Sequence, residues 1–369
     1  MKRYGNLWPQ ITDYGNLYRA YKKARKGKAD SAQVSDFAFD LEWNLHQLRD
    51  ELILGTYVPG AYRLFTIYER KQRLIAAAPF RDRVVHHALM NVLEPILDKR
   101  FIYDSYACRK DKGVHRAVDR YQKWARRYAY VMKLDIASYF HSIDHAILKQ
   151  MLRLRFKDQK ALELLELIID SGPDAHTETG IPIGNLTSQI FANLYLDQFD
   201  HFIKETLKVK AYLRYVDDML LLGNDKEVLW QLVIKITDQL AQLKLMLHPR
   251  KIQIYRTCDG VDVLGYRVFP GFRRLRNDNG HRFARKLKRY AKQYNQHENE
   301  FTDFHCSVHS WIGHAMHADS VGLRSRILGD TIFIKGNRPN ERASRFARGF
   351  LEQQTEEVAF RQSQQEPPY

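Results

Sequence analysis

The feature that most constrains this chain is a pair of adjacent aspartates between two apolar runs. Residues 210–222 read KAYLRYVDDMLLL, with strand-forming side chains on both sides of Asp217 and Asp218. This pattern predicts a β-hairpin that carries the two acids at its turn. Two like charges in an apolar hairpin are unfavourable unless a cation compensates them, and a metal ion would supply that compensation.

An upstream segment adds a third carboxylate. Residues 128–136, YAYVMKLDI, alternate and predict a strand that ends near Asp135. A single acid at a strand end more often caps a turn. Carboxylates that converge on one point instead suit Mg²⁺, and phosphoryl-transfer enzymes place two such ions ~3.5–4 Å apart. We therefore predict that Asp135, Asp217 and Asp218 hold two Mg²⁺ ions, which Mn²⁺ can replace.

The order of elements around these acids predicts an α+β fold. Leucine and isoleucine spacing predicts helices at residues 144–156, 159–169, about 187–207 and 227–243. Residues 261–268 read as another short strand. The order strand, helices, hairpin, helix, strand fits a split βαβ unit of the ferredoxin-like kind, βαββαβ.

The charge of the chain favours a polyanionic partner. Its net charge is +16, and the calculated pI is near 9.6. No run approaches the ~18 apolar residues of a membrane helix, and the N-terminus lacks an apolar signal core, so we expect a cytoplasmic protein without a membrane partner. The three cysteines are far apart in the sequence, which predicts reduced thiols.

Basic residues are concentrated in two segments. Residues 2–28 predict a basic helix, for which nucleic-acid contact and a solvated charged face both remain open. Beyond Pro270 the composition shifts, and nine Lys or Arg face one acid between Arg273 and Lys292. This pattern predicts a separate basic helical domain. Residues 352–369 are polar and predict a disordered tail.

The segment 133–140, which contains DIASYF, and the YVDD of residues 215–218 together resemble motifs A and C of reverse transcriptases. The resemblance extends over nearly the whole chain. Further segments similar to that family are RLIAAAPFRDRVVHHAL at 73–89, SYACRKDKGVHRA at 105–117, IPIGNLTSQIFANLYL at 181–196, LHPRK at 247–251 and VLGY at 263–266.

The resemblance implies a right-hand polymerase fold with fingers, a ferredoxin-like palm and a helical thumb. On this basis residues 1–129 would form an N-terminal helix and the fingers, with part of the palm. The remaining parts would be the palm at 130–270 with a fingers insertion at about 144–185, a basic helical thumb at 271–351, and the tail at 352–369.

The resemblance also assigns roles to the metal-binding and sugar-selecting residues. Asp135 and Asp217 would bridge both metals, Asp218 would support them, and the Ile136 carbonyl would complete a site. Phe140 would pack under a deoxyribose and exclude a ribose 2′-hydroxyl. From spacing alone, a core position is the favoured interpretation of Phe140.

Other residues would bind the triphosphate and the leaving group. Arg73, with Lys71 or Arg70 beside it, would clamp the incoming dNTP, and Lys251 would protonate pyrophosphate. An exposed, solubilising lysine remains the alternative for both lysines. The primer grip would comprise Leu264, Gly265 and Tyr266. Duplex contacts would come from Arg273, Arg274, Arg276, Arg285, Lys288 and Arg289.

One motif narrows the resemblance. Most relatives carry QGxxxSP where residues 183–189 read IGNLTSQ, and this IGxxxSQ form resembles the enzymes of bacterial and phage diversity-generating retroelements. Similar segments occur at 24–28, 104–109 and 310–320. The subgroup copies a template RNA with errors opposite adenine, in mutagenic retrohoming. Ile183, beside Gly184 in the dNTP site, cannot donate the hydrogen bonds of a Gln, which would weaken mismatch rejection.

The resemblance implies a template RNA, an RNA–cDNA hybrid, dNTPs and a small, basic, oligomeric accessory protein as partners. An intron-type or defence-associated reverse transcriptase is an alternative, as is a non-catalytic RNA-binding scaffold. A zinc site is less favoured than packing or backbone contact for the cluster His305, Cys306, His309, His314 and His317.

Overall fold

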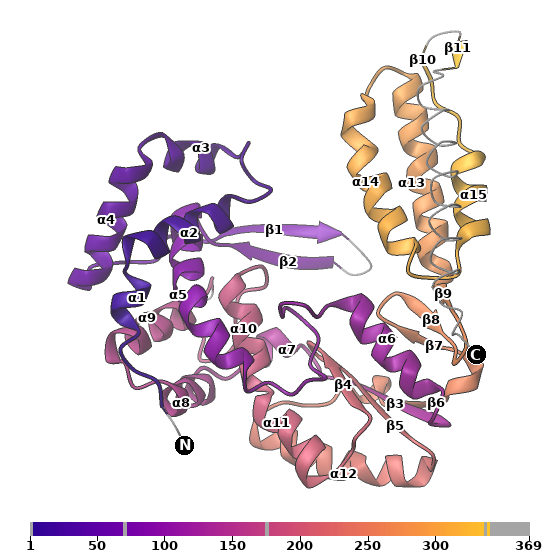
Figure 1. The fold of residues 1–369 in the computed structure, drawn as a ribbon, viewed down its shortest axis with the longest axis horizontal. Coiled ribbons are helices and arrows are strands. Elements are labelled where there is room, and N and C mark those ends of the chain that lie inside the picture. Colours follow the sequence, from indigo (N-terminus) through magenta and orange to yellow (C-terminus); the bar gives the residue numbers. More distant parts are fainter. Residues whose placement is uncertain (1–2, 69–71, 174–176, 336–337, 340–369) are drawn as a thin grey trace, which may run out of the picture. The chain divides into compact units, whose positions relative to one another are not determined.

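The computed structural model describes residues 3–68, 72–173, 177–335 and 338–339. The chain mixes helices and sheets, as the α+β prediction requires (Figure 1). It divides into two compact units. Unit 1 comprises residues 1–117 and 130–254, and unit 2 comprises residues 118–129 and 255–369. Among the described helices, none is both long and apolar enough to cross a membrane.

The N-terminal part of unit 1 is a helical layer with one hairpin. Its elements are α1 (Trp8–Ile11), α2 (Tyr14–Arg25), α3 (Ala32–Phe39), α4 (Leu41–Leu54), β1 (Arg63–Tyr68), β2 (Gln72–Ala77) and α5 (Phe80–Asp98). Helix α2 packs along α5 (Figure 1). It buries Leu17, Ala20, Tyr21 and Ala24 at helical spacing, and its basic side chains lie on the remaining faces.

A four-stranded sheet forms the rest of unit 1 together with its helices. The strands are β3 (Tyr130–Asp135), β4 (Tyr212–Tyr215), β5 (Asp218–Gly223) and β6 (Gln253–Arg256), in the order β4-β5-β3-β6. The last two residues of β6 already belong to unit 2. The helices are α7 (Tyr139–Ser142), α8 (His145–Arg155), α9 (Gln159–Asp170), α10 (Leu186–Tyr195), α11 (Asp197–His201) and α12 (Lys226–Gln242). Val131, Met132 and Leu134 of β3 lie in the core.

Two expectations for this region were wrong. The helix expected at 187–207 is broken: after α10 and α11 the chain makes a π-helical turn, Phe202–Thr206. The strand expected at 261–268 is a hairpin outside this sheet, and β6 takes its place after α12. The reason is backbone geometry at Leu264 and Gly265, whose φ values of +47° and +95° turn the chain sharply.

Unit 2 contains a small sheet and a helical bundle. The sheet is β7 (Val261–Val263), β8 (Tyr266–Val268) and β9 (Arg273–Leu275). The helices are α13 (Asn277–Asn295), α14 (Phe301–Ala315) and α15 (Val321–Gly329), and α6 (Val114–Ala125) leads from unit 1 into unit 2. The short strands β10 (Ile334–Lys335) and β11 (Arg338–Pro339) follow, and 3₁₀ turns occupy Pro249–Lys251 and Thr257–Asp259.

Helix α13 carries the basic residues from which the sequence predicted a helical domain. It runs without a break through Asn279 and Gly280, although glycine is a poor helix former. Gly280 is accommodated because α15 packs closely there: a Cβ on Gly280 would lie 3.3 Å from Leu323 Cδ2. Phe283 and Leu287 continue the same buried stripe.

Candidate active site

The turn between β4 and β5, Tyr215–Asp218, is here called the hairpin tip. The antiparallel register of β3 and β5 places Asp135 directly opposite Asp218, and Tyr215 pairs with Asp218 on the other side. Val216 and Asp217 form the turn, and Val216 has a φ of +57°. Asp217 is partly buried, while Asp218 is exposed. Sheet pairing therefore brings all three predicted acids to one end of the sheet.

Charge at the hairpin tip is only partly compensated. Burial raises the pKa of Asp217 to about 6; the charges of Asp218 and Asp135 raise it as well, and Lys251 lowers it. The Lys251 ammonium forms an ion pair with the Asp135 carboxylate. The backbone N–H of His248 donates to the Asp135 carbonyl at 2.8 Å, which ties the segment before Lys251 to the end of β3. Lys251, predicted as a proton donor, thus lies against a predicted metal ligand.

The three acids have the chemistry of ligands for a divalent cation, but they do not form a preorganised metal site. Within the described residues, no group of three or more His, Cys, Asp and Glu side chains is gathered closely enough to hold a metal. Asp135, Asp217 and Asp218 nevertheless offer only carboxylate oxygens, which hard cations prefer. The pKa of Asp217 is raised first by burial and then by the negative charges of Asp218 and Asp135. A divalent cation would offset both effects.

The predicted nucleotide-binding residues come from two segments that touch. The N–H of Ala76 in β2 donates to the carbonyl of Ile183 at 3.0 Å. Gly184 has a φ of +123°, and a Cβ there would lie 2.9 Å from Ile75 Cγ2. Arg73 is exposed on the same strand β2. The structure therefore packs the 183–184 segment against β2, while Arg70 and Lys71 lie outside the described residues.

Phe140 and Ile136 follow the end of β3. Phe140 lies in α7, is partly buried, and packs edge-on against Tyr139 with ring centroids 5.7 Å apart. The N–H of Ile181 donates to the Phe140 carbonyl at 2.9 Å, which links this turn to the segment that leads to Ile183. Ile136 is fully buried and bridges to Leu247.

The residues predicted for primer and duplex lie in unit 2. Leu264 and Gly265 form the β7–β8 turn, and the Tyr266 hydroxyl donates to the His314 carbonyl at 2.8 Å. Burial lowers the pKa of His314. Two of the predicted arginines are paired within the unit: Arg273 with Asp119 and Arg276 with Asp278, each at 2.6 Å. The remaining predicted contacts, all exposed, are Arg274, Arg285, Lys288 and Arg289.

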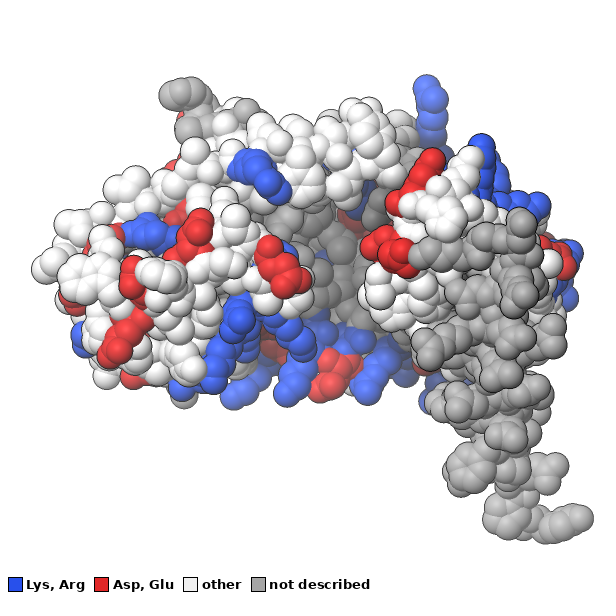
Figure 2. All heavy atoms as spheres, turned by 90° about the horizontal axis from the view of Figure 1, so that it is seen from above, with Lys and Arg blue, Asp and Glu red and all other residues white. Residues whose placement is uncertain are grey.

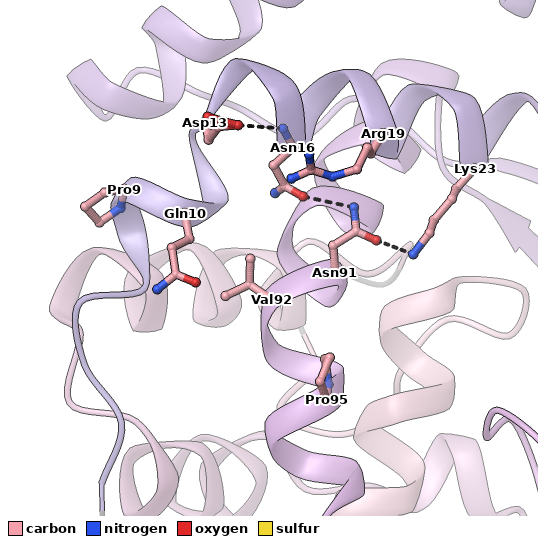
Figure 3. A pocket seen from close by; sticks show the side chains of 9 residues that line it. All are labelled: Pro9, Gln10, Asp13, Asn16, Arg19, Lys23, Asn91, Val92 and Pro95. Atoms are coloured by element: carbon pink, nitrogen blue, oxygen red, sulfur yellow. Dashed lines mark hydrogen bonds between the residues drawn. The ribbon is translucent and has the colours of Figure 1, made fainter.

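A polar cavity of about 710 Å³ lies among α1, α2 and α5 (Figure 3). Asn91 donates to Asn16 Oδ1 at 3.0 Å, and Lys23 donates to Asn91 Oδ1 at 2.5 Å. Arg19 also lines it, so two basic side chains of segment 2–28 line this space. Lys and Arg side chains also gather along the lower margin of the face shown in Figure 2.

Sequence reasoning missed the residues beneath the hairpin tip. Arg214, next to Tyr215, is fully buried and forms an ion pair at 2.7 Å with Asp200, which is also fully buried. The only sequence signal was an arginine in an otherwise apolar strand, two residues before Val216. Whether such an arginine points inward depends on a partner in α11, and no local pattern identifies that partner.

The chain is similar to one protein family and to several known proteins. Residues 68–268 match a family model described as "Reverse transcriptase (RNA-dependent DNA polymerase)". Protein YkfC of Escherichia coli (strain K12) is 26% identical over 303 residues, which cover 70% of this chain and 80% of YkfC. Group II intron-encoded protein LtrA of Lactococcus lactis is 27% identical over 205 residues, or 53% of this chain, and the match covers only 33% of LtrA. Telomerase from Candida albicans aligns with a TM-score of 0.45 and 13% identity, over 63% of this chain and 50% of the telomerase chain.

Proposed function

The chain belongs to the reverse transcriptase family of RNA-dependent DNA polymerases, and from this premise we propose that it copies a template RNA into cDNA at the hairpin tip. The observation that carries the proposal is the strand register, which sets Asp135 opposite Asp218 with Asp217 next to it. The mechanism needs carboxylates from separate strands at one point, and the register supports the proposal because it brings these acids to the same end of the sheet.

We assign the sheet of unit 1 to a polymerase palm. The order β4-β5-β3-β6 is that of a ferredoxin-like βαββαβ sheet. The fingers would be built from the layer that contains β1 and β2, and the thumb from α13, α14 and α15. The proposed palm, 130–270, extends past Ile254, where unit 1 ends, so its last residues would come from the β7–β8 hairpin.

In the proposed reaction the primer 3′-oxygen attacks the α-phosphorus of a dNTP. A P–O bond forms, the α–β phosphoanhydride bond breaks, and pyrophosphate leaves. Asp135, Asp217 and Asp218, with the Ile136 carbonyl, would hold two divalent ions, Mg²⁺ or Mn²⁺, which neutralise phosphate charge when bound. Lys251 would give its proton to pyrophosphate. Its ammonium forms an ion pair with Asp135, so it lies next to the proposed metal-binding acids.

Selection of the nucleotide would come from the segments that meet at β2. Arg73, with Lys71 or Arg70, would bind the triphosphate. Phe140 would reject a ribose 2′-hydroxyl by packing under the sugar. These roles rest on the resemblance and on the contact between β2 and Ile183.

We further propose that synthesis is error-prone opposite template adenine, as in diversity-generating retroelements. Ile183 has no hydrogen-bond donor on its side chain, so it would contact the base pair by packing alone, and discrimination would weaken. In primer extension, Ile183→Gln should lower misincorporation opposite adenine several-fold, with misincorporation opposite template guanine as the internal control. Unchanged errors opposite adenine would contradict the proposal.

An intron-type enzyme is the second candidate, because LtrA is among the relatives of this chain. Flanking DNA separates the two. A near-duplicate repeat pair that differs at adenines supports the retroelement, and an intron around the gene supports the alternative. With the retroelement come the other proposed partners, a template RNA and a small basic oligomeric accessory protein, and a cytoplasmic location in a bacterial or phage-infected cell.

The central test is cDNA synthesis on a primed RNA template with Mg²⁺ and dNTPs. We expect product from the wild-type chain and none from Asp217→Ala, with RNA affinity unchanged. A wild-type chain that binds RNA but makes no cDNA would favour a non-catalytic scaffold.

A further inference from the structure

Arg214 lies directly beneath the hairpin tip, on β4. Its guanidinium donates two short hydrogen bonds to Asp200 of α11, from Nε to Oδ1 at 2.8 Å and from Nη2 to Oδ2 at 2.7 Å. The Tyr212 hydroxyl donates to the same Oδ1 at 2.7 Å. Both members of the ion pair are 0% exposed. Asp200 thus fixes the guanidinium in one orientation.

The remaining nitrogen of Arg214 points toward the turn. Nη1 donates to the backbone carbonyl of Val216 at 3.0 Å and to Asn193 Oδ1 at 3.3 Å. Val216 is the residue with a φ of +57°, in the left-handed region that β-branched side chains avoid. A turn in this conformation persists only where its surroundings hold it. The bond from Arg214 is such a restraint, one residue before Asp217.

We propose that Arg214 is a positioning residue for the catalytic aspartates: anchored by Asp200, it holds the Val216 carbonyl and so fixes the turn that presents Asp217 and Asp218 opposite Asp135. The inference rests on the proposed function, because it assigns that function's ligands their geometry. Stability alone does not account for the pair, since a buried ion pair is often no more stabilising than apolar residues of similar volume. The guanidinium reaches both groups because separate nitrogens of one planar group contact Asp200 and the Val216 carbonyl.

Arg214→Lys tests this directly. A lysine keeps the charge beside Asp200, but its side chain ends in one nitrogen, which cannot occupy the separate positions from which Nη2 holds Asp200 and Nη1 holds the Val216 carbonyl. The matched control is Arg155→Lys. Arg155 is also a buried arginine; it lies on α8 and forms an ion pair with Asp197 at 3.2 Å. Mn²⁺ affinity, measured by electron paramagnetic resonance without template or dNTP, should fall at least five-fold in Arg214→Lys and stay within two-fold in Arg155→Lys. Turnover in primer extension should fall at least ten-fold only in Arg214→Lys, with template–primer affinity unchanged in both.

Equal Mn²⁺ affinity and equal turnover in the two lysine variants, with both melting temperatures lowered, would show that Arg214 only supports the fold, and would overturn the inference while the wild-type activity stands. Absence of cDNA synthesis by the wild type would instead reject the proposed function, and the Mn²⁺ comparison would still judge the positioning role.

Val216→Gly is a second test that leaves the buried pair intact. Glycine adopts positive φ without strain, and Arg214 can still hold its carbonyl. Mn²⁺ affinity should therefore stay within three-fold of the wild type, and the same substitution should recover part of the affinity lost in Arg214→Lys. A ten-fold loss in Val216→Gly alone would mean that the valine side chain, not Arg214, fixes the turn.

Discussion

Two aspartates that lie close to β4 differ in how their charge is balanced. Asp200, on α11, receives hydrogen bonds from the β4 residues Arg214 and Tyr212 and is 0% exposed. Asp217, at the tip, is partly buried beside Asp218 and Asp135, and its pKa rises to about 6. The first charge is satisfied within the chain. The charge of Asp217 would be balanced by a bound cation, and sites with a raised pKa of this kind are where function is expected.

The comparison predicts that the tip governs activity. Replacing Asp217 by Ala should lower the rate of cDNA synthesis by more than about 10³-fold, since it removes a ligand on which transition-state stabilisation depends. Single-nucleotide incorporation measures the effect. Asp225→Ala serves as the control, because Asp225 caps α12 and should change stability only. Activity within ten-fold of the wild type in Asp217→Ala would place the chemistry elsewhere.

The buried ion pair of Asp200 and Arg214 should govern stability instead. Asp200→Asn leaves the Arg214 charge buried without a counter-charge, and we expect a loss of about 3–5 kcal/mol in the free energy of unfolding. Urea unfolding measures it. Asp170→Asn is the control, because its pair with Lys149 is exposed and contributes only ~0–1 kcal/mol. Equal losses in the two variants would remove the distinction between satisfied and surface charge.

The tip should gain stability when its charge is removed. Asp217→Asn is expected to raise the free energy of unfolding at pH 8 by about 1–2 kcal/mol when a chelator is present, because a shift of one pKa unit corresponds to about 1.4 kcal/mol. The folded pKa is raised, so the folded protein holds the proton up to about pH 6 and the unfolded chain loses it near pH 4. The wild type should therefore lose stability as pH rises through this window.

Melting temperatures of the wild type and Asp217→Asn between pH 4 and pH 8 check the sign. The gap between the two proteins should open as the pH increases and be complete above about pH 6. A gap that closes with rising pH would mean that the fold stabilises Asp217 as a carboxylate.

The sequence predicted the hairpin, β3 and the helices at 144–156 and 159–169 because the period of apolar residues is a local signal. Asp144 and Asp158 cap α8 and α9 in the structure. It could not predict that Leu264 and Gly265 split a strand into a hairpin, since left-handed φ at a leucine is set by tertiary contacts. Arg214 escaped for the same reason: its role depends on α11, which is brought beneath β4 only by the fold.

The weakest expected effect extends the comparison to the basic helix of unit 2. Arg276 is balanced by Asp278 at 2.6 Å, whereas Lys288 is exposed on α13 and forms no ion pair among the described residues. A lysine that contacts a phosphate displaces a counterion from the RNA when the protein binds. Lys288→Ala should therefore reduce the slope of log affinity against log salt by about 0.7–0.9 for a template RNA. Arg276→Ala should reduce it less, because the bound phosphate would have to displace Asp278. Both slopes are measured by fluorescence anisotropy at salt concentrations from about 50 to 300 mM, a range that includes physiological ionic strength. Equal slopes would show that internal pairing does not decide which basic side chains meet the RNA.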